Sequence, residues 1–124
     1  MFRDPELFHF IRERFASVWA LELLLLMRGD PDRWWTVADL AAQMRANETL
    51  VESALAGLEV ARLVERAADG GRRFAPADAH MAELCGRLAV AFKERPVSVI
   101  KTIATPPDKL KGLADAFRFK GGST

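Results

Sequence analysis

Apolar residues recur at helical spacing along most of the chain, and short polar, glycine- or proline-containing segments separate these runs. Asp4-Pro5-Glu6 predicts a helix start, because Asp caps free amides and Pro is tolerated at the first helical position. No Gly or Pro follows until Gly29, so we expect one helix over residues 5–28. Such a helix would be roughly 36 Å long, and a break near Ser17 is the alternative. The stretch LELLLLM (21–27) is apolar nearly all round, which predicts burial at the centre of the core.

The middle of the chain predicts two short helices and a hairpin. Thr36 with Asp39 three positions later favours a helix over residues 37–45, and the capping-box pattern from Thr49 to Glu52 favours another over residues 50–61. Two short strands around an Asp-Gly-Gly turn predict a hairpin over residues 63–75.

The last third of the chain predicts further helices between prolines. We expect them over residues 79–94, 97–104 and 108–117, followed by a flexible end at 121–124. The length fits one domain, here residues 1–120, since single domains cluster near ~100–150 residues. The expected fold class is mainly α with a small β-hairpin.

Charge is unevenly distributed along the chain. The total is +1, which excludes a globally basic nucleic-acid binder and a strongly acidic mimic. Residues 1–85 carry ten arginines against fourteen acids, whereas residues 86–124 carry eight cations against three acids. All five lysines lie after residue 85. An acidic body therefore precedes a basic tail. Its cations hold DNA phosphates or an acidic partner, or they form solvated helix faces, or they balance the acidic body in cis.

Cysteine usage and hydropathy indicate the compartment. Cys85 is the one cysteine and cannot form an internal disulfide, which favours a reducing environment. The N-terminal residues are too polar for a secretory signal. The most apolar stretch, residues 18–27, is about half the ~20 residues needed to span a bilayer. We expect a soluble cytoplasmic protein that does not enter the membrane.

The order of the predicted elements carries a resemblance. The segment LAAQMRANETLVESALAGLEVARLV (40–64) resembles the winged helix-turn-helix superfamily, and residues 18–76 are similar to MarR-type and ArsR-type bacterial regulators. The resemblance implies a winged helix-turn-helix with extra N- and C-terminal helices, and a transcription regulator that binds double-stranded DNA. Arg62 departs from the pattern, because such proteins usually place Gly there with a positive φ. A side chain would cost roughly 1 kcal/mol, so we expect a differently built turn.

The resemblance places DNA contacts on the second helix of the motif and on the wing. The candidate nucleic-acid contacts are Thr49, Leu50, Ser53, Arg66, Arg72, Arg73, Lys109 and Lys111. The outward face of the second helix carries three acids and no cation, which opposes insertion into the major groove. For the arginines on the hairpin, the alternative is that they are solvated or paired with Asp69 or Glu65.

The acidic helix favours a second hypothesis, a protein-interaction or adaptor module without direct DNA contact. Leu50, Ala56 and Gly57 offer a small apolar surface, which we expect to be ringed by glutamates. Those glutamates are Glu48, Glu52 and Glu59. Apolar contact inside a charged rim is typical of protein interfaces.

Candidate residues for catalysis or metal binding are few. His80 and Glu83 share a helix face but Cys85 points away from them, and two ligands are too few for a structural zinc site. We expect Cys85 to be a small buried residue and His9 an ordinary helix-surface residue. The sequence contains no glycine-rich phosphate loop and no paired-His helix motif. We therefore expect no enzyme, no cofactor and no metal.

Large apolar residues on the first helix and on the helix over 79–94 exceed what one buried face needs. We expect them to form a homodimer, the state in which winged-helix regulators read two half-sites. The expected interface residues are Phe8, Ile11, Phe15, Leu88 and Phe92. The alternative is a monomer that buries them.

Overall fold

The computed structural model describes residues 4–104, which form six helices and one two-stranded antiparallel sheet. The helices are α1 (Pro5–Arg14), α2 (Val18–Arg28), α3 (Val37–Met44), α4 (Glu48–Val60), α5 (Ala79–Glu94) and α6 (Pro96–Ala104), and the strands are β1 (Val64–Arg66) and β2 (Arg72–Phe74). The expected mainly helical class with a small hairpin is confirmed. The helix expected over 108–117 and the flexible end at 121–124 lie outside the described residues.

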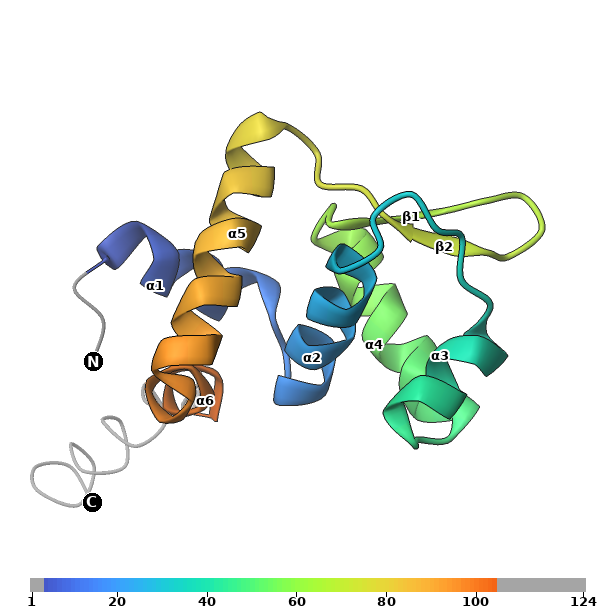
Figure 1. Ribbon diagram of the computed structural model, residues 1–124, viewed down its shortest axis with the longest axis horizontal. Helices are drawn as coiled ribbons and strands as arrows, with labels where there is room; N and C mark the ends of the chain where they lie inside the picture. Colours follow the sequence, from blue (N-terminus) through green and yellow to red (C-terminus); the bar gives the residue numbers. More distant parts are fainter. Residues whose placement is uncertain (1–3, 105–124) are drawn as a thin grey trace, which may run out of the picture.

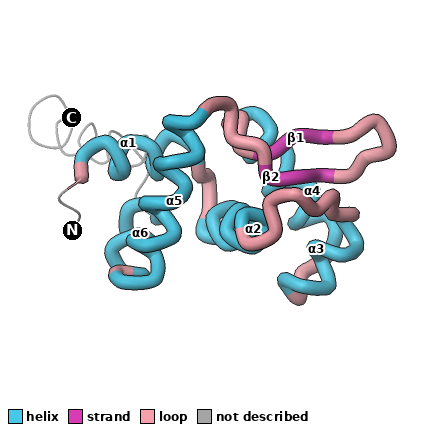
Figure 2. Tube along the Cα trace, turned by 45° about the horizontal axis from the view of Figure 1, so that its top comes forward, coloured by secondary structure: helices cyan, strands magenta, loops and turns pink. Residues whose placement is uncertain are grey.

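The elements are arranged in two groups around α2. Figures 1 and 2 show α1, α5 and α6 together at one end of the molecule, and α3, α4 and the β1–β2 hairpin at the other. The end of the hairpin points away from the α1, α5 and α6 group. No helix within residues 4–104 is long and apolar enough to cross a membrane.

A break divides residues 5–28 into α1 and α2. The single helix expected over this range is wrong, and the alternative break near Ser17 is confirmed. Phe15 leaves α1 in an extended conformation. Ser17 is also extended, and its Oγ accepts a hydrogen bond from the Ala20 amide at 3.1 Å, which begins α2. Phe15, before the break, and Ala20, after it, are both buried in the core.

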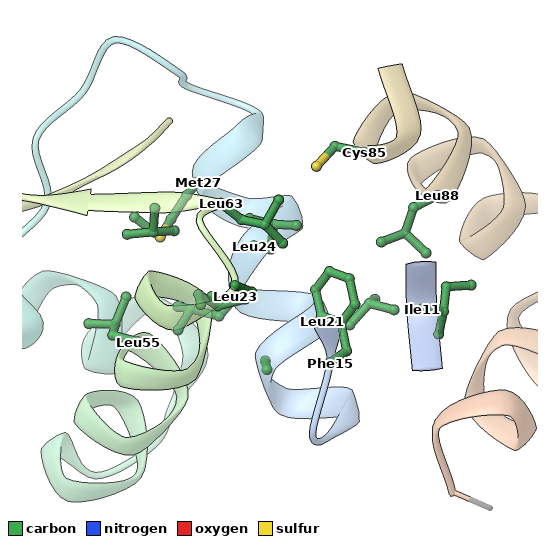
Figure 3. Close-up of a cluster of buried hydrophobic side chains, with 14 of the residues drawn as sticks. Ile11, Phe15, Leu21, Leu23, Leu24, Met27, Leu55, Leu63, Cys85 and Leu88 are labelled. Carbon is green, nitrogen blue, oxygen red and sulfur yellow. The ribbon is translucent and has the colours of Figure 1, made fainter. Parts of the chain in front are cut away.

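Helix α2 lies at the centre of the core, as the sequence predicts. Leu21, Leu23, Leu24 and Met27 are all buried. Figure 3 shows these side chains between two sets of partners. One set comes from α4 and the start of the hairpin (Leu55 and Leu63), and the other comes from α1 and α5 (Ile11, Cys85 and Leu88).

Three residues of the expected dimer interface belong to this core. Ile11, Phe15 and Leu88 are buried within the single chain. Their assignment to a dimer interface is therefore wrong, because the α1–α2 break and the packing of α5 cover their side chains. Phe8 and Phe92 are partly exposed, so their role in an interface stays a prediction.

Side-chain caps begin both α3 and α4. Thr36 begins α3 by accepting the Asp39 amide at 3.0 Å, as expected. Asn47 begins α4, because its Oδ1 accepts the Leu50 amide at 2.7 Å. The expected start at residue 50 with Thr49 as its cap is wrong, since Asn47 provides a cap two residues earlier and Thr49 lies in the first turn.

Helix α4 ends in a left-handed residue that is not glycine. Arg62 has φ +63°, and the Leu63 amide donates to the Leu58 carbonyl at 3.0 Å. The Arg62 amide donates to the Glu59 carbonyl at the same distance, and together these bonds form a Schellman motif. The differently built turn expected at Arg62 is therefore wrong. The turn has the usual geometry, and the arginine adopts the strained conformation because the two bonds and buried Leu63 determine it.

Replacing Arg62 with Gly is expected to stabilise the protein by about 1 kcal/mol, because Gly adopts positive φ without a Cβ penalty. The free energy of unfolding from urea denaturation measures the change. Arg62→Ala is the matched control, since it removes the same charge but keeps the Cβ. An equal gain from Arg62→Ala would show that charge, not backbone strain, limits stability here.

An exposed cluster of charged residues joins the start of α1 to α5. Arg87 donates to Asp4 at 2.9 Å and to Glu6 and Glu83 at 2.8 Å each. His80 Nε2 lies 2.6 Å from Glu6 Oε2. The Leu7 amide and Arg87 lower the pKa of Asp4, and hydrogen bonds from Arg87 and His80 lower the pKa of Glu6. These carboxylates stabilise the folded state only while they are ionised.

The contribution of this cluster is expected to depend on pH. Because the folded-state pKa values of Asp4 and Glu6 are lowered, their stabilisation is complete above the unfolded values near 4. It is lost as the pH falls through the folded values. Arg87→Gln should lower stability at pH 7, and the difference from wild type should disappear by about pH 2. Denaturant unfolding between pH 2 and 7 measures this, with exposed Lys93→Gln as control.

Candidate functional site

The arginine at the start of β2 holds the hairpin against α4. Only 3% of Arg72 is exposed. Its Nε donates to Glu59 at 3.1 Å, its Nη2 lies 3.4 Å from Glu52, and its Nη1 donates to the Gly70 carbonyl. The backbone of Arg72 also exchanges two hydrogen bonds with Trp35, at 2.7 and 2.8 Å. One residue therefore links α4, the hairpin turn and the segment before α3.

The other two hairpin arginines are also paired. Arg66 donates to Glu59 at 3.2 Å. Arg73 donates to Glu65, opposite it in the sheet register, at 2.9 Å. The Arg73 guanidinium also lies over the Trp34 ring, 4.4 Å from its centroid. Pairing of Arg73 with Glu65 is one of the alternatives given by the sequence, and it is confirmed.

These contacts correct the nucleic-acid assignment at Arg72. Its guanidinium is buried among carboxylates, so it cannot reach a phosphate without breaking the contact between the hairpin and α4. Arg66 and Arg73 remain partly exposed, but each would have to leave a carboxylate to bind DNA. Lys109 and Lys111 lie outside the described residues. Helix α6, which carries Lys101, lies at the opposite end of the molecule from the hairpin (Figure 1).

Arg72→Met is expected to destabilise the protein by about 2–4 kcal/mol, because it keeps the apolar stem but leaves Glu59 partly buried without its main partner. Arg66→Met is the matched control. It removes an exposed partner of the same carboxylate, and its cost should stay below about 1 kcal/mol. Urea unfolding of both variants gives the comparison. Equal losses would contradict a structural role specific to Arg72.

The outward face of α4 lines an apolar groove of about 910 Å³. Its other wall is the junction of α1 and α2, from Arg12 to Ala20. Arg14 fixes this wall, because its Nη1 donates to the Ala61 carbonyl at the end of α4 at 2.7 Å. Apolar side chains stand exposed along the groove: Trp19 is 36% exposed and Val60 is 84% exposed.

A glycine lies in the middle of this face. Gly57 is in the interior of α4, where Gly costs roughly 1 kcal/mol relative to Ala. A Cβ built on Gly57 would meet nothing within 4 Å, so packing within the described chain does not explain the glycine. Its neighbours Ala54 and Ala56 are also small and line the groove. The backbone of α4 is therefore open to close approach from outside.

The groove brings together several residues that the sequence singles out. Leu50 and Ser53, expected on DNA, both line it, as do Ala56 and Gly57 of the alternative surface. Thr49 is exposed but is not among the lining residues.

The expected rim of Glu48, Glu52 and Glu59 is wrong, because none of the three lines the groove. The carboxylates of Glu52 and Glu59 contact Arg72 next to the hairpin, and Glu48 lines a separate pocket there. The charged residues at the groove are instead Arg12, Glu13 and Arg14 from α1.

Trp19 and Val60 are surface residues that the sequence pattern did not single out. Trp19 falls on the same helical stripe of large side chains as Phe15 if residues 5–28 form one helix. The break at residues 15–17 separates the two side chains, so Phe15 is buried and Trp19 lies in the groove. The β-branched Val60 at the exposed end of α4 was a signal that could have been noticed, because the core positions are Val51, Leu55 and Leu58.

The groups considered for catalysis or metal binding are not arranged as a site. Cys85 is buried, as expected, and burial raises the pKa of its thiol to about 11. His9 is exposed on α1, also as expected. Within residues 4–104 no group of three or more His, Cys, Asp or Glu side chains could hold a metal ion. His80 and Glu83 belong to the Arg87 cluster.

Comparisons with protein-family models, with curated proteins and with solved structures found no match to this chain. The groove and the paired hairpin are therefore interpreted from their own chemistry.

Proposed function

We propose that this chain is a winged helix-turn-helix protein that binds another protein through the groove on α4. The order of the elements supports the fold assignment: α3 and α4 joined by a tight turn precede a hairpin that acts as the wing. An isolated antiparallel β-bridge between Trp35 and Arg72 places a short extended segment beside β2, next to the wing.

The charge on the wing argues for a protein partner over DNA. Affinity for DNA depends on cations that neutralise phosphates. In this chain the carboxylates of α4 and β1 already contact Arg66, Arg72 and Arg73. Residues 48–60, the helix that would enter the major groove, contain three glutamates and no Lys or Arg. A regulator contacting DNA through the wing remains the second hypothesis, and the experiment below separates the two.

The groove has the features of a helix-binding surface. Small residues at its centre let a partner backbone approach closely, while Trp19 and Leu50 provide the large apolar contacts that dominate protein interfaces. An amphipathic helix with apolar residues at i, i+3, i+4 and i+7 is the partner that fits such a surface. The observation that most strongly supports this proposal is Gly57, a helix-interior glycine with open space above it on an apolar face.

Two substitutions at Gly57 are expected to separate folding from binding. Gly57→Ala and Gly57→Gln should both stabilise the fold, by up to about 1 kcal/mol, because each replaces a glycine in a helix. Only the Gln side chain is long enough to fill the groove. Peptides selected on the full chain from a displayed library of helical 16-residue sequences should bind Gly57→Ala within about threefold of wild type and lose at least about tenfold on Gly57→Gln.

Duplex DNA provides the opposing measurement. Labelled duplex titrated at two salt concentrations should show no binding that weakens steeply with salt. Salt-dependent duplex binding that Arg66→Ala and Arg73→Ala together abolish would contradict the proposal and favour the regulator. Peptide binding unaffected by Gly57→Gln would also contradict it. The expected homodimer stays a prediction, with Phe8 and Phe92 as its remaining candidate residues.

A further inference from the structure

We infer that the groove on α4 is occupied in cis by the C-terminal segment of the same chain, residues 108–118, which competes with the partner. This inference rests on the proposed function, because it names a regulatory occupant of the same groove. The segment lies outside the described residues. Its sequence, its attachment to the end of α6 and the shape of the groove support the inference.

The sequence of the segment matches a groove-binding helix. Leu110, Leu113, Ala114 and Phe117 stand at i, i+3, i+4 and i+7, the spacing of the anchors by which amphipathic helices bind apolar grooves. Residues 106–108, Pro-Pro-Asp, provide a helix start. The charged residues of the segment, Asp108, Lys109, Lys111, Asp115 and Arg118, occupy other positions of the helical repeat, so one face is apolar and the other charged.

The sizes agree. Ten residues separate Leu50 from Val60 along α4, which is about 15 Å at 1.5 Å per residue. A helix over residues 108–117 would have about the same length. The groove's volume of about 910 Å³ can hold several large side chains, and a Cβ at Gly57 would meet nothing within 4 Å.

The point of attachment favours docking in cis. The described chain ends in α6, which packs against α1 and α2. The junction of α1 and α2 is also one wall of the groove. Residues 105–108 can extend up to about 14 Å from the end of α6. A segment of the same chain has a raised effective concentration at any surface that its linker can reach, which favours even weak apolar contacts.

Disulfide trapping in the full chain tests the position of the segment. Ser53→Cys places a thiol in the groove, and Ala114→Cys places one among the apolar anchors of the segment, both with small changes in volume. Cys85 can remain, because its thiol is buried and its pKa is raised. The matched control pairs Ala114→Cys with Val90→Cys, an exposed apolar position on α5 outside the groove.

The Ser53/Ala114 pair should form an intramolecular disulfide at least about tenfold faster than the Val90/Ala114 pair at micromolar protein. Adding Leu113→Asp and Phe117→Asp should remove this advantage, while the far-UV circular dichroism of the core persists. Equal rates for the two pairs, faster trapping at Val90, or a disulfide-linked dimer as the main product would overturn docking in cis.

Peptide affinity distinguishes this inference from the proposed function. If the segment fills the groove nine-tenths of the time, Leu113→Asp with Phe117→Asp should raise the affinity of the selected peptides about tenfold. Unchanged affinity, with Gly57→Gln still blocking the peptides, would overturn the inference and leave the proposed function intact. If no peptide binds either form, the proposed function fails, and the trapping rates alone decide whether the segment occupies the groove.

Discussion

The burial of one guanidinium determines how the second half of the structure is built. Arg72 cannot lie in the interior without compensating charge, because an unpaired buried cation costs several kcal/mol. Glu59 and Glu52 on α4 supply that charge, and the Gly70 carbonyl accepts a further hydrogen bond. The hairpin is therefore held against α4 and Trp35 in one position. The same pairing removes from the surface the charge that a DNA-binding wing needs, so stability and DNA affinity compete for one arginine.

The break between α1 and α2 has an equally large consequence for function. A continuous helix over residues 5–28 would carry Phe15 and Trp19 on one stripe and bury both. With the chain extended at Phe15 and capped again at Ser17, Phe15 enters the core and Trp19 lies beside α4. The Arg14 side chain then fixes the junction to the end of α4. The groove forms at this break, where the chain is extended at Phe15 and Ser17 caps the next helix.

The sequence predicted what local chemistry determines and missed what depends on tertiary packing. Burial of α2, the Thr36 cap and the hairpin followed from periodicity, capping preference and turn residues. The sequence indicated strain at Arg62, but the differently built turn predicted there was wrong. The hydrogen bonds that enforce the positive φ involve the burial of Leu63. The role of Arg72 could not be predicted, since exposed and buried arginines on a three-residue strand have the same sequence signature. The glutamates of α4 were noticed as acidic, but their partners lie on another element.

Behind the near-zero net charge, several arginines of the described residues are paired with carboxylates. Arg66, Arg72 and Arg73 each contact a carboxylate, and Arg87 contacts three. These four arginines thus act over hydrogen-bond distances, where they orient elements. Long-range attraction of a polyanion requires clustered cations without such partners. Along α4 the surface is instead apolar with small residues at its centre, and contacts with such a surface depend on shape and the hydrophobic effect. A face of this kind discriminates partners by how closely a backbone can approach it, which makes Gly57 more informative about function than any of the charged residues around it.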